Sequence, residues 1–231
     1  HGYLDVPANA YWRADSFFAS SFGGNYSILA VARINSANAQ LFYSGNANAW
    51  SNNGTVSPQG TNHTNGTSKT CRVYEGDHQD EWTTWALTVN TSGNPYAPGC
   101  MNYTVGRAVN CRWNSGQALS SGYLEIARSS SQICLAEYAI YNRRLTWIEE
   151  QEIISGWMAT YGLYDPIAES DSLLLWTGNS TSQGNNGDGV FVRLARRLKV
   201  PAIQFSISGG TTSTLLNQID EMADVAAYFR Q

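Results

Sequence analysis

The chain has 231 residues, of which 42% are hydrophobic, 12% aromatic and 14% charged. This composition predicts a folded, soluble protein with a large apolar core, and it excludes a disordered chain. The net charge of -4 excludes broad attraction to nucleic acid or to an anionic membrane, and no apolar run approaches the roughly 18 residues that a membrane-spanning helix needs.

Short β-prone runs make up the chain from residue 1 to about residue 132, and loops rich in Asn, Gly, Ser and Thr separate them. The clearest runs are Tyr26 to Ile34, Gln40 to Tyr43, Trp82 to Val89 and Gly122 to Ala127. Regular short strands with such loops predict a β-sandwich or jelly roll. The first run is almost entirely apolar, as expected for a central strand of a packed sheet.

A further strand is predicted at the start of the stretch Cys134 to Leu163. There Ala136, Tyr138 and Ile140 alternate with their neighbours, which is the period of a strand with one buried face. A turn and a helix follow this strand. The whole stretch therefore predicts the end of a domain.

The helix of this stretch has clear signals at both ends. Thr146, with Glu149 three residues later, forms a capping box, and Gly162 supplies a left-handed stop. An apolar stripe at helical spacing lies between them. Its members are Ile153, Ile154, Trp157, Met158 and Tyr161.

Residues 136–146 read AEYAIYNRRLT, and Tyr161-Gly162 follow the predicted helix. This pattern resembles the C-terminal edge of laminin-G and concanavalin A-like jelly rolls, where a strand of this kind leads to a short helix ending in Tyr-Gly. The resemblance implies a mainly β fold, an antiparallel jelly-roll sandwich with a C-terminal capping helix, over about residues 10–163. We place the first domain at residues 1–163.

A different pattern begins after Asp165-Pro166, and we assign it to a second unit at residues 164–231. It predicts the order β-α-β-α, which calls for a parallel sheet with crossover helices. The predicted elements are Leu173 to Trp176, Val190 to Leu198 capped by Asp188, Ala202 to Ile207, and Leu215 to Phe229. Two parallel strands cannot bury both of their faces alone. The jelly roll, another copy of the chain or further sequence must cover them.

The loops of this unit resemble the opening of SGNH-type serine esterases. Residues 178–184 read GNSTSQG after one predicted strand, and residues 207–210 read ISGG at the end of the next. The resemblance implies Ser180 as nucleophile and the amides of Ser180 and Gly209 as oxyanion donors. However, Asn179 replaces the usual aspartate, and no histidine follows His78 to serve as a base. We expect a catalytically silent segment, with a truncated or inactive carbohydrate (acetyl) esterase as the alternative.

The four cysteines, Cys71, Cys100, Cys111 and Cys134, lack the close paired spacing of a zinc site. Disulfides are the better interpretation, and three pairings are possible. The stretch between Cys100 and Cys111 contains a plausible turn between two strands. We therefore predict the disulfides Cys100–Cys111 and Cys71–Cys134.

Seven Asn-x-Ser/Thr triplets are candidate N-glycan acceptors if the source is eukaryotic. They begin at Asn25, Asn53, Asn62, Asn65, Asn90, Asn102 and Asn179. Together with the disulfides they predict a secreted glycoprotein. His1 is a plausible terminus left by signal-peptide cleavage.

Surface tryptophans are candidate sugar-binding residues. Trp50 and Trp113 are bordered by Asn and Ser, which favours surface positions. Trp82 and Trp85 differ by three positions, so on a regular strand they face opposite sides and at most one points away from a buried face.

The densest acidic group in the chain is EGDHQDE at residues 75–81. Its side chains Asp77, Asp80 and Glu81 are candidate calcium ligands, although a solvated acidic loop is the competing interpretation. A basic helix face is predicted further along the chain, and we expect it to face solvent or an acidic neighbour rather than nucleic acid. That face comprises Arg193, Arg196, Arg197 and Lys199.

The sequence thus predicts a non-catalytic extracellular protein that works in assembly, for which a polymer or filament is one form, or in carbohydrate binding. Its expected partners are further copies of itself or glycans. No cofactor is expected apart from the calcium considered above.

Overall fold

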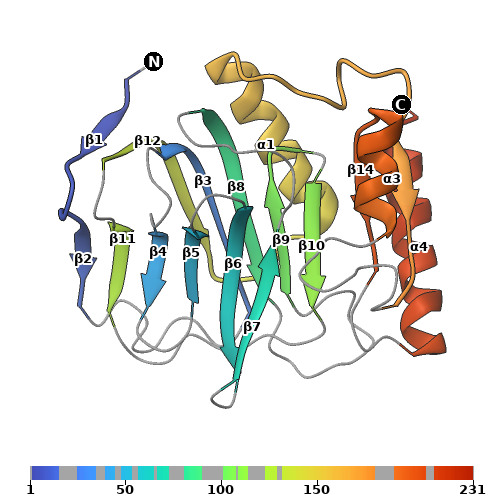
Figure 1. Cartoon of the computed structure of the whole chain (residues 1–231), viewed down its shortest axis with the longest axis horizontal. Helices are drawn as coiled ribbons and strands as arrows, with labels where there is room; N and C mark the ends of the chain where they lie inside the picture. The colour runs from blue at the N-terminus through green and yellow to red at the C-terminus, as the bar shows by residue number, and fades with distance from the viewer. Residues whose placement is uncertain are drawn as a thin grey trace.

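The computed structural model describes residues 2–15, 25–34, 40–44, 48–53, 57–64, 67–72, 81–89, 101–107, 109–113, 123–128, 132–179, 190–206 and 211–230. In these residues the protein is mainly β, as predicted. Two six-stranded antiparallel sheets form the layers of a sandwich (Figure 1).

The first layer, called sheet A here, has the strand order β1-β12-β3-β8-β9-β10. The second layer, sheet B, has the order β2-β11-β4-β5-β6-β7. Sheet A comprises β1 (Leu4–Val6), β12 (Ile133–Tyr141), β3 (Tyr26–Ile34), β8 (Trp82–Val89), β9 (Met101–Val105) and β10 (Val109–Trp113). Sheet B comprises β2 (Trp12–Ala14), β11 (Leu124–Arg128), β4 (Gln40–Ser44), β5 (Asn48–Asn53), β6 (Ser57–Thr64) and β7 (Thr67–Arg72).

The core between the layers takes alternate residues of the two central strands of sheet A. Ile28 and Ala30 of β3 contribute to it, together with Trp85 and Leu87 of β8. Because β3 is also covered on its outer face, nearly all of its residues are buried. This explains why its sequence is almost continuously apolar.

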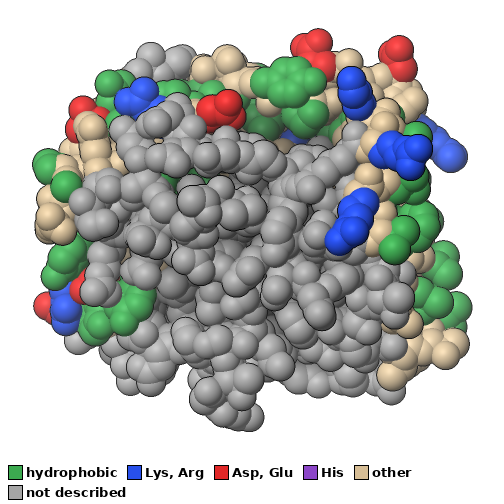
Figure 2. Space-filling model, viewed as in Figure 1, with side chains coloured by type: hydrophobic (Ala, Val, Ile, Leu, Met, Phe, Trp, Pro, Cys, Tyr) green, Lys and Arg blue, Asp and Glu red, His purple; other side chains and the backbone are tan. Residues whose placement is uncertain are grey.

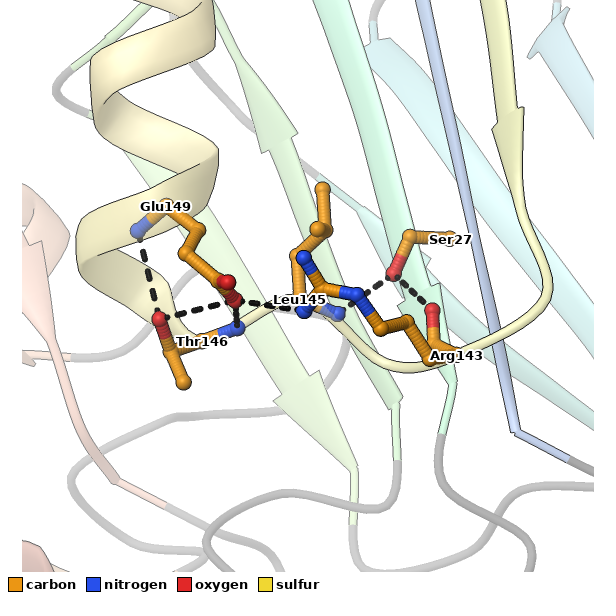
Figure 3. A network of polar contacts seen from close by, with 5 residues as sticks. All are labelled: Ser27, Arg143, Leu145, Thr146 and Glu149. Atoms are coloured by element: carbon orange, nitrogen blue, oxygen red, sulfur yellow. Dashed lines mark hydrogen bonds and ion pairs between the residues drawn. The ribbon is translucent and has the colours of Figure 1, made fainter.

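Helix α1 (Trp147–Tyr161) begins and ends where the sequence predicts. The backbone N–H of Glu149 donates to the Thr146 hydroxyl at 3.2 Å, and the Glu149 carboxylate accepts from the Thr146 N–H at 2.8 Å (Figure 3). Gly162 ends the helix in the left-handed conformation, with φ at 63°. The capping box and the glycine stop are therefore confirmed.

A buried serine of β3 fixes the turn between β12 and α1. The Ser27 hydroxyl donates to the Arg143 carbonyl at 3.0 Å and accepts from the Leu145 N–H at 2.8 Å (Figure 3). Since Ser27 is fully buried, its two bonds satisfy a hydroxyl that would otherwise be costly to bury.

Helix α1 lies against the outer face of sheet A. Ile154 and Met158 pack there with Leu29 of β3 and Ala86 of β8. On the neighbouring strand β9, the Thr104 hydroxyl donates to the buried Glu150 carboxylate of the helix at 2.5 Å. The helix therefore covers only part of this face, next to β3, β8 and β9.

The C-terminal part follows the predicted β-α-β-α order and lies beside β10 at one end of the sandwich (Figure 1). Its elements are β13 (Leu174–Trp176), α3 (Val190–Leu198), β14 (Ala202–Gln204) and α4 (Thr212–Tyr228). The two strands are parallel, with Leu175 opposite Ile203. Strand β14 is shorter than expected.

Both faces of the β13–β14 pair are covered. On one face, Ile203 and Phe205 pack against Val225 of α4 and Trp147 of α1. On the other face, Ala202 packs against Phe191 and Ala195 of α3. The sandwich thus supplies part of the cover, through the first turn of α1.

The prediction that Ala136 shares a buried face of β12 with Tyr138 and Ile140 is wrong. A bulge interrupts its pairing with β3, because Leu135 lies opposite Ala32 while Glu137 lies opposite Val31. Tyr138 therefore packs against the core between the sheets, but Ala136 no longer shares that face.

The predicted disulfide Cys71–Cys134 is also wrong. Cys134 is a free, fully buried cysteine on β12, between β1 and β3 of sheet A. Cys71 lies on β7, at the far edge of sheet B. The interleaved strand order separates the two residues, and spacing along the chain does not reveal that order. Cys111 lies on β10, and Cys100 lies outside the described residues.

Candidate functional site

An aromatic pocket opens on the part of the outer face of sheet A that α1 leaves uncovered. Its volume is about 240 Å³. The lining residues are Gly2, Tyr3, Trp82, Ala136, Tyr161 and Leu163. We call it the aromatic pocket below, because three of its six lining residues are Tyr or Trp.

Four neighbouring strands bring residues from distant parts of the chain to this pocket. Trp82 of β8 lies opposite Arg33 of β3, and Arg33 lies opposite Cys134 of β12. Cys134 in turn lies opposite Asp5 of β1. Residues opposite one another in an antiparallel sheet share a face, so these four side chains form one row across sheet A.

Polar contacts join the members of this row. The Arg33 guanidinium donates to Cys134 Sγ at 3.3 Å, and the Cys134 thiol donates to Asp5 Oδ1 at 3.0 Å. Burial raises the pKa of the Cys134 thiol, and the bond to Asp5 raises it further. The row holds Arg33 next to the pocket, 5.8 Å from the centre of the Trp82 ring.

The aromatic rings meet at defined angles. Tyr3 and Trp82 pack edge to face, with ring centres 5.3 Å apart and an angle of 66° between the planes. Tyr3 is nevertheless 51% exposed. The N-terminal segment therefore adds an accessible ring to the pocket.

The third ring comes from the last residue of α1. The Tyr161 hydroxyl donates to the Glu137 carboxylate at 3.0 Å, and burial together with this bond raises the pKa of Tyr161. Glu137 lies next to Ala136, which the β12 bulge places in the pocket lining. The pocket thus combines apolar ring surfaces with a carboxylate and a guanidinium nearby, a set suited to a ligand with both apolar and hydroxyl groups.

The two predicted faces of strand β8 are confirmed. Trp85 belongs to the core between the sheets and is 1% exposed, whereas Trp82 lines the aromatic pocket. The predicted sugar-binding residues Trp50 and Trp113 lie on β5 and β10, in different sheets. The positions of their side chains are outside what the structure describes.

Tyr3 and Tyr161 were not predicted as site residues. The sequence places Tyr161 in the apolar stripe of the helix, and no motif at Tyr3 predicts an aromatic pocket. Tyr3 meets Trp82 through the order of the strands in sheet A, and Tyr161 meets it because α1 packs on the outer face of that sheet. The sequence feature that could have located the pocket is the spacing of Trp82 and Trp85, which places them on opposite faces of the strand.

The other predicted site residues mostly fall outside the described part of the chain. Ser180, Gly209, Asp77 and Asp80 do so, while Glu81 is exposed just before β8. Among the described residues, no group of three His, Cys, Asp or Glu side chains is arranged to hold a metal ion. The calcium and esterase hypotheses therefore remain predictions.

The glycosylation candidates lie in varied settings. Asn25 is half-buried before β3, and Asn179 is exposed after β13. Asn53, Asn62 and Asn102 lie on strands, and Asn65 and Asn90 lie outside the described residues. In the described part of the chain, no helix is long and apolar enough to cross a membrane.

Comparison with known proteins finds no matching family model and no matching curated sequence. Solved structures do resemble this chain. The receptor-binding domain of botulinum neurotoxin mosaic serotype C/D matches with a TM-score of 0.52 and 10% identity, over 66% of this chain and 41% of that chain. The binding domain of botulinum neurotoxin serotype G matches with a TM-score of 0.51 and 13% identity, over 68% and 43%. The likeness shows a shared β-sandwich fold.

Proposed function

We propose that this protein is a non-catalytic recognition module that binds a glycan in the aromatic pocket. The observation that carries this proposal is the convergence of Tyr3, Trp82 and Tyr161 around one opening on sheet A. Three rings from three separate parts of the chain are not needed there for the core, which lies between the sheets and under α1.

The chemistry of the pocket suits a sugar ring. The apolar C–H face of a pyranose packs against Tyr and Trp rings, which bury large areas with little loss of side-chain freedom. The hydroxyl groups of the sugar need charged or polar partners, and Glu137 and Arg33 lie beside the rings. A volume of about 240 Å³ is small, since pockets for drug-sized ligands hold roughly 300–1,000 Å³. We therefore assign the pocket to one terminal sugar residue of a longer glycan.

The solved structures that share the fold support a recognition role by analogy. The serotype C/D structure is described as a receptor-binding domain and the serotype G structure as a binding domain, and this chain matches less than half the length of each. A fold does not determine a function, so the resemblance only supplements the support that the pocket gives.

The proposed setting is extracellular, with N-glycans on the protein itself. The seven Asn-x-Ser/Thr triplets support it, and Asn179 is accessible to a transferase. Intact mass of the native protein before and after enzymatic removal of N-glycans tests this part. If protein produced in a eukaryotic secretory host has the mass of the bare chain, the proposed glycosylation is contradicted.

A glycan array tests the recognition role. We expect selective binding by the native protein, and loss of that binding in Trp82→Ala and Tyr3→Ala. Tyr3→Ala guards against a folding defect, because Tyr3 is largely exposed and precedes β1. Trp12→Ala is the matched control, since Trp12 is 43% exposed on sheet B, away from the pocket. Equal binding by Tyr3→Ala, Trp82→Ala and the control would refute the proposal.

A further inference from the structure

We propose that copies of this chain associate head to tail, with the exposed face of α3 from one copy docking in a groove between α1 and α4 of the next. The groove and the helix face are both separate from the aromatic pocket. Their charges and apolar side chains match, and they lie on opposite faces of the β13–β14 pair.

The groove lies between the start of α1 and the middle of α4 and has a volume of about 530 Å³. Its α4 wall carries Asp220, Glu221 and Asp224, and α4 contains no Lys or Arg along its whole length. Among the described residues that line the groove, Arg144 is the one cation, and it lies on the opposite wall. This excess of carboxylates favours a cationic occupant.

Apolar side chains accompany these carboxylates. Leu216 and Ile219 of α4 are 59% and 47% exposed, and they lie three positions apart on one side of the helix. Ala223 and Ala227 continue this side of α4 and are exposed as well. A contiguous apolar stripe beside a charged groove is typical of an interface that is covered in the assembled protein.

Helix α3 has the complementary surface. Its sequence VFVRLARRL contains three arginines and no acidic residue. Arg197 and the following Lys199 are exposed, and Val190 and Leu198 are 61% and 54% exposed. Figure 2 shows Lys and Arg side chains gathered on the right of the visible face, where Figure 1 places α3.

The packing of the two strands separates these surfaces. Phe191 and Ala195 of α3 cover one face of the β13–β14 pair, and Val225 of α4 covers the other. The basic face and the acidic groove therefore point away from each other within one molecule. A contact between two different surfaces of identical molecules is heterologous, so it extends into a chain of copies unless the rotation closes a ring.

A copy of the same chain is the occupant that the charges favour, because α3 carries both properties that the groove requires. Its arginines suit the carboxylates, and its exposed Val190 and Leu198 suit the stripe at Leu216 and Ile219. Electrostatic complementarity of this kind fixes the orientation of the contact and speeds association.

Sedimentation velocity of the full chain over a concentration series tests the proposal. We expect species larger than a dimer at high concentration, and weaker association as salt is raised. Arg197→Glu and the double variant Leu216→Glu/Ile219→Glu should each weaken association at least tenfold. Leu4→Glu is the matched control, because it changes an exposed residue of β1 outside both surfaces and should leave association unchanged.

Mixing the two disrupted variants decides whether the contact is heterologous. Each retains one intact surface, so the 1:1 mixture should form a dimer and stop there. The native chain remaining monomeric throughout the series would overturn the proposal. A mixture that stays monomeric while the native chain associates would also overturn it, since that result shows that the two intact surfaces do not dock with each other.

Discussion

Arg107 and Asp165 form a largely buried ion pair that joins the sandwich to the C-terminal part of the chain. Arg107 follows β9 in the turn to β10, and Asp165 lies between α1 and β13. Their side chains are 8% and 14% exposed. The same carboxylate accepts the backbone N–H groups of Ile167 and Ala168 at 3.0 and 3.2 Å, so it also shapes the turn after Pro166.

Asp165→Ala is expected to lower the free energy of unfolding by about 3–5 kcal/mol, because it leaves the Arg107 charge buried and unpaired. Asp165→Asn keeps an acceptor for the turn but loses the charge, so its loss should be smaller. Urea unfolding of the two variants and the native chain measures the difference. Changes below about 0.5 kcal/mol in both would show that the pair contributes nothing to stability.

The capping carboxylate of α1 should make stability depend on acid pH. The pKa of Glu149 is lowered to about 2, first by the hydrogen bond from the Arg143 side chain and then by the bond from the backbone N–H of Thr146. A lowered pKa means that the folded state favours the ionised form, so its stabilisation is present above about pH 4.5 and is lost as pH falls toward 2.

Glu149→Gln should therefore cost about 0.5–1 kcal/mol near pH 6, and this difference from the native chain should vanish near pH 2. Thermal unfolding across this pH range checks it. A difference that does not change with pH would show that the charge of Glu149 is not what stabilises the helix start.

The Cys134 thiol should resist alkylation in the folded protein, because it is fully buried and its pKa is raised. Unfolding without a reductant should expose it to iodoacetamide at once. Peptide mapping of the alkylated chain measures this directly. Recovery of Cys134 in a disulfide-linked peptide would restore the pairing that the structure contradicts.

Removing the Tyr138 hydroxyl should leave stability unchanged or raise it by about 1 kcal/mol. This hydroxyl is buried without a hydrogen-bond partner in the described structure, and burial raises its pKa well above the usual value. Ser27→Ala is the contrasting variant, because it removes two buried hydrogen bonds and should cost about 1–3 kcal/mol. If chemical unfolding shows Tyr138→Phe to be less stable than Ser27→Ala, the claim that the Tyr138 hydroxyl is buried without a partner is contradicted.

Local signals in the sequence predicted the fold well, because they depend on residues close in the chain. Helix α1 begins after Thr146 and ends before Gly162, as expected. The apolar run from Tyr26 to Ile34 coincides with strand β3. The bulge at Ala136 escaped prediction, since a period of two contains no information on where pairing slips. The division of the chain after Leu163 stays a prediction, because Trp147 of α1 packs in the core under α4.

The candidate site was only partly predictable. Alternation on β8 identified one outward tryptophan, and Trp82 is that residue. Its neighbours Tyr3 and Tyr161 are separated from it by about eighty residues on either side, and the order β1-β12-β3-β8 together with the packing of α1 on sheet A brings them together. That order depends on long-range pairing, which no short motif encodes.

NMR titration with the glycan that binds best on the array tests the central claim most directly. We predict that the aromatic resonances of Tyr3, Trp82 and Tyr161 shift together and saturate, while the indole signal of Trp12 stays in place. The absence of any bound glycan, or shifts confined to residues outside the aromatic pocket, would contradict the account.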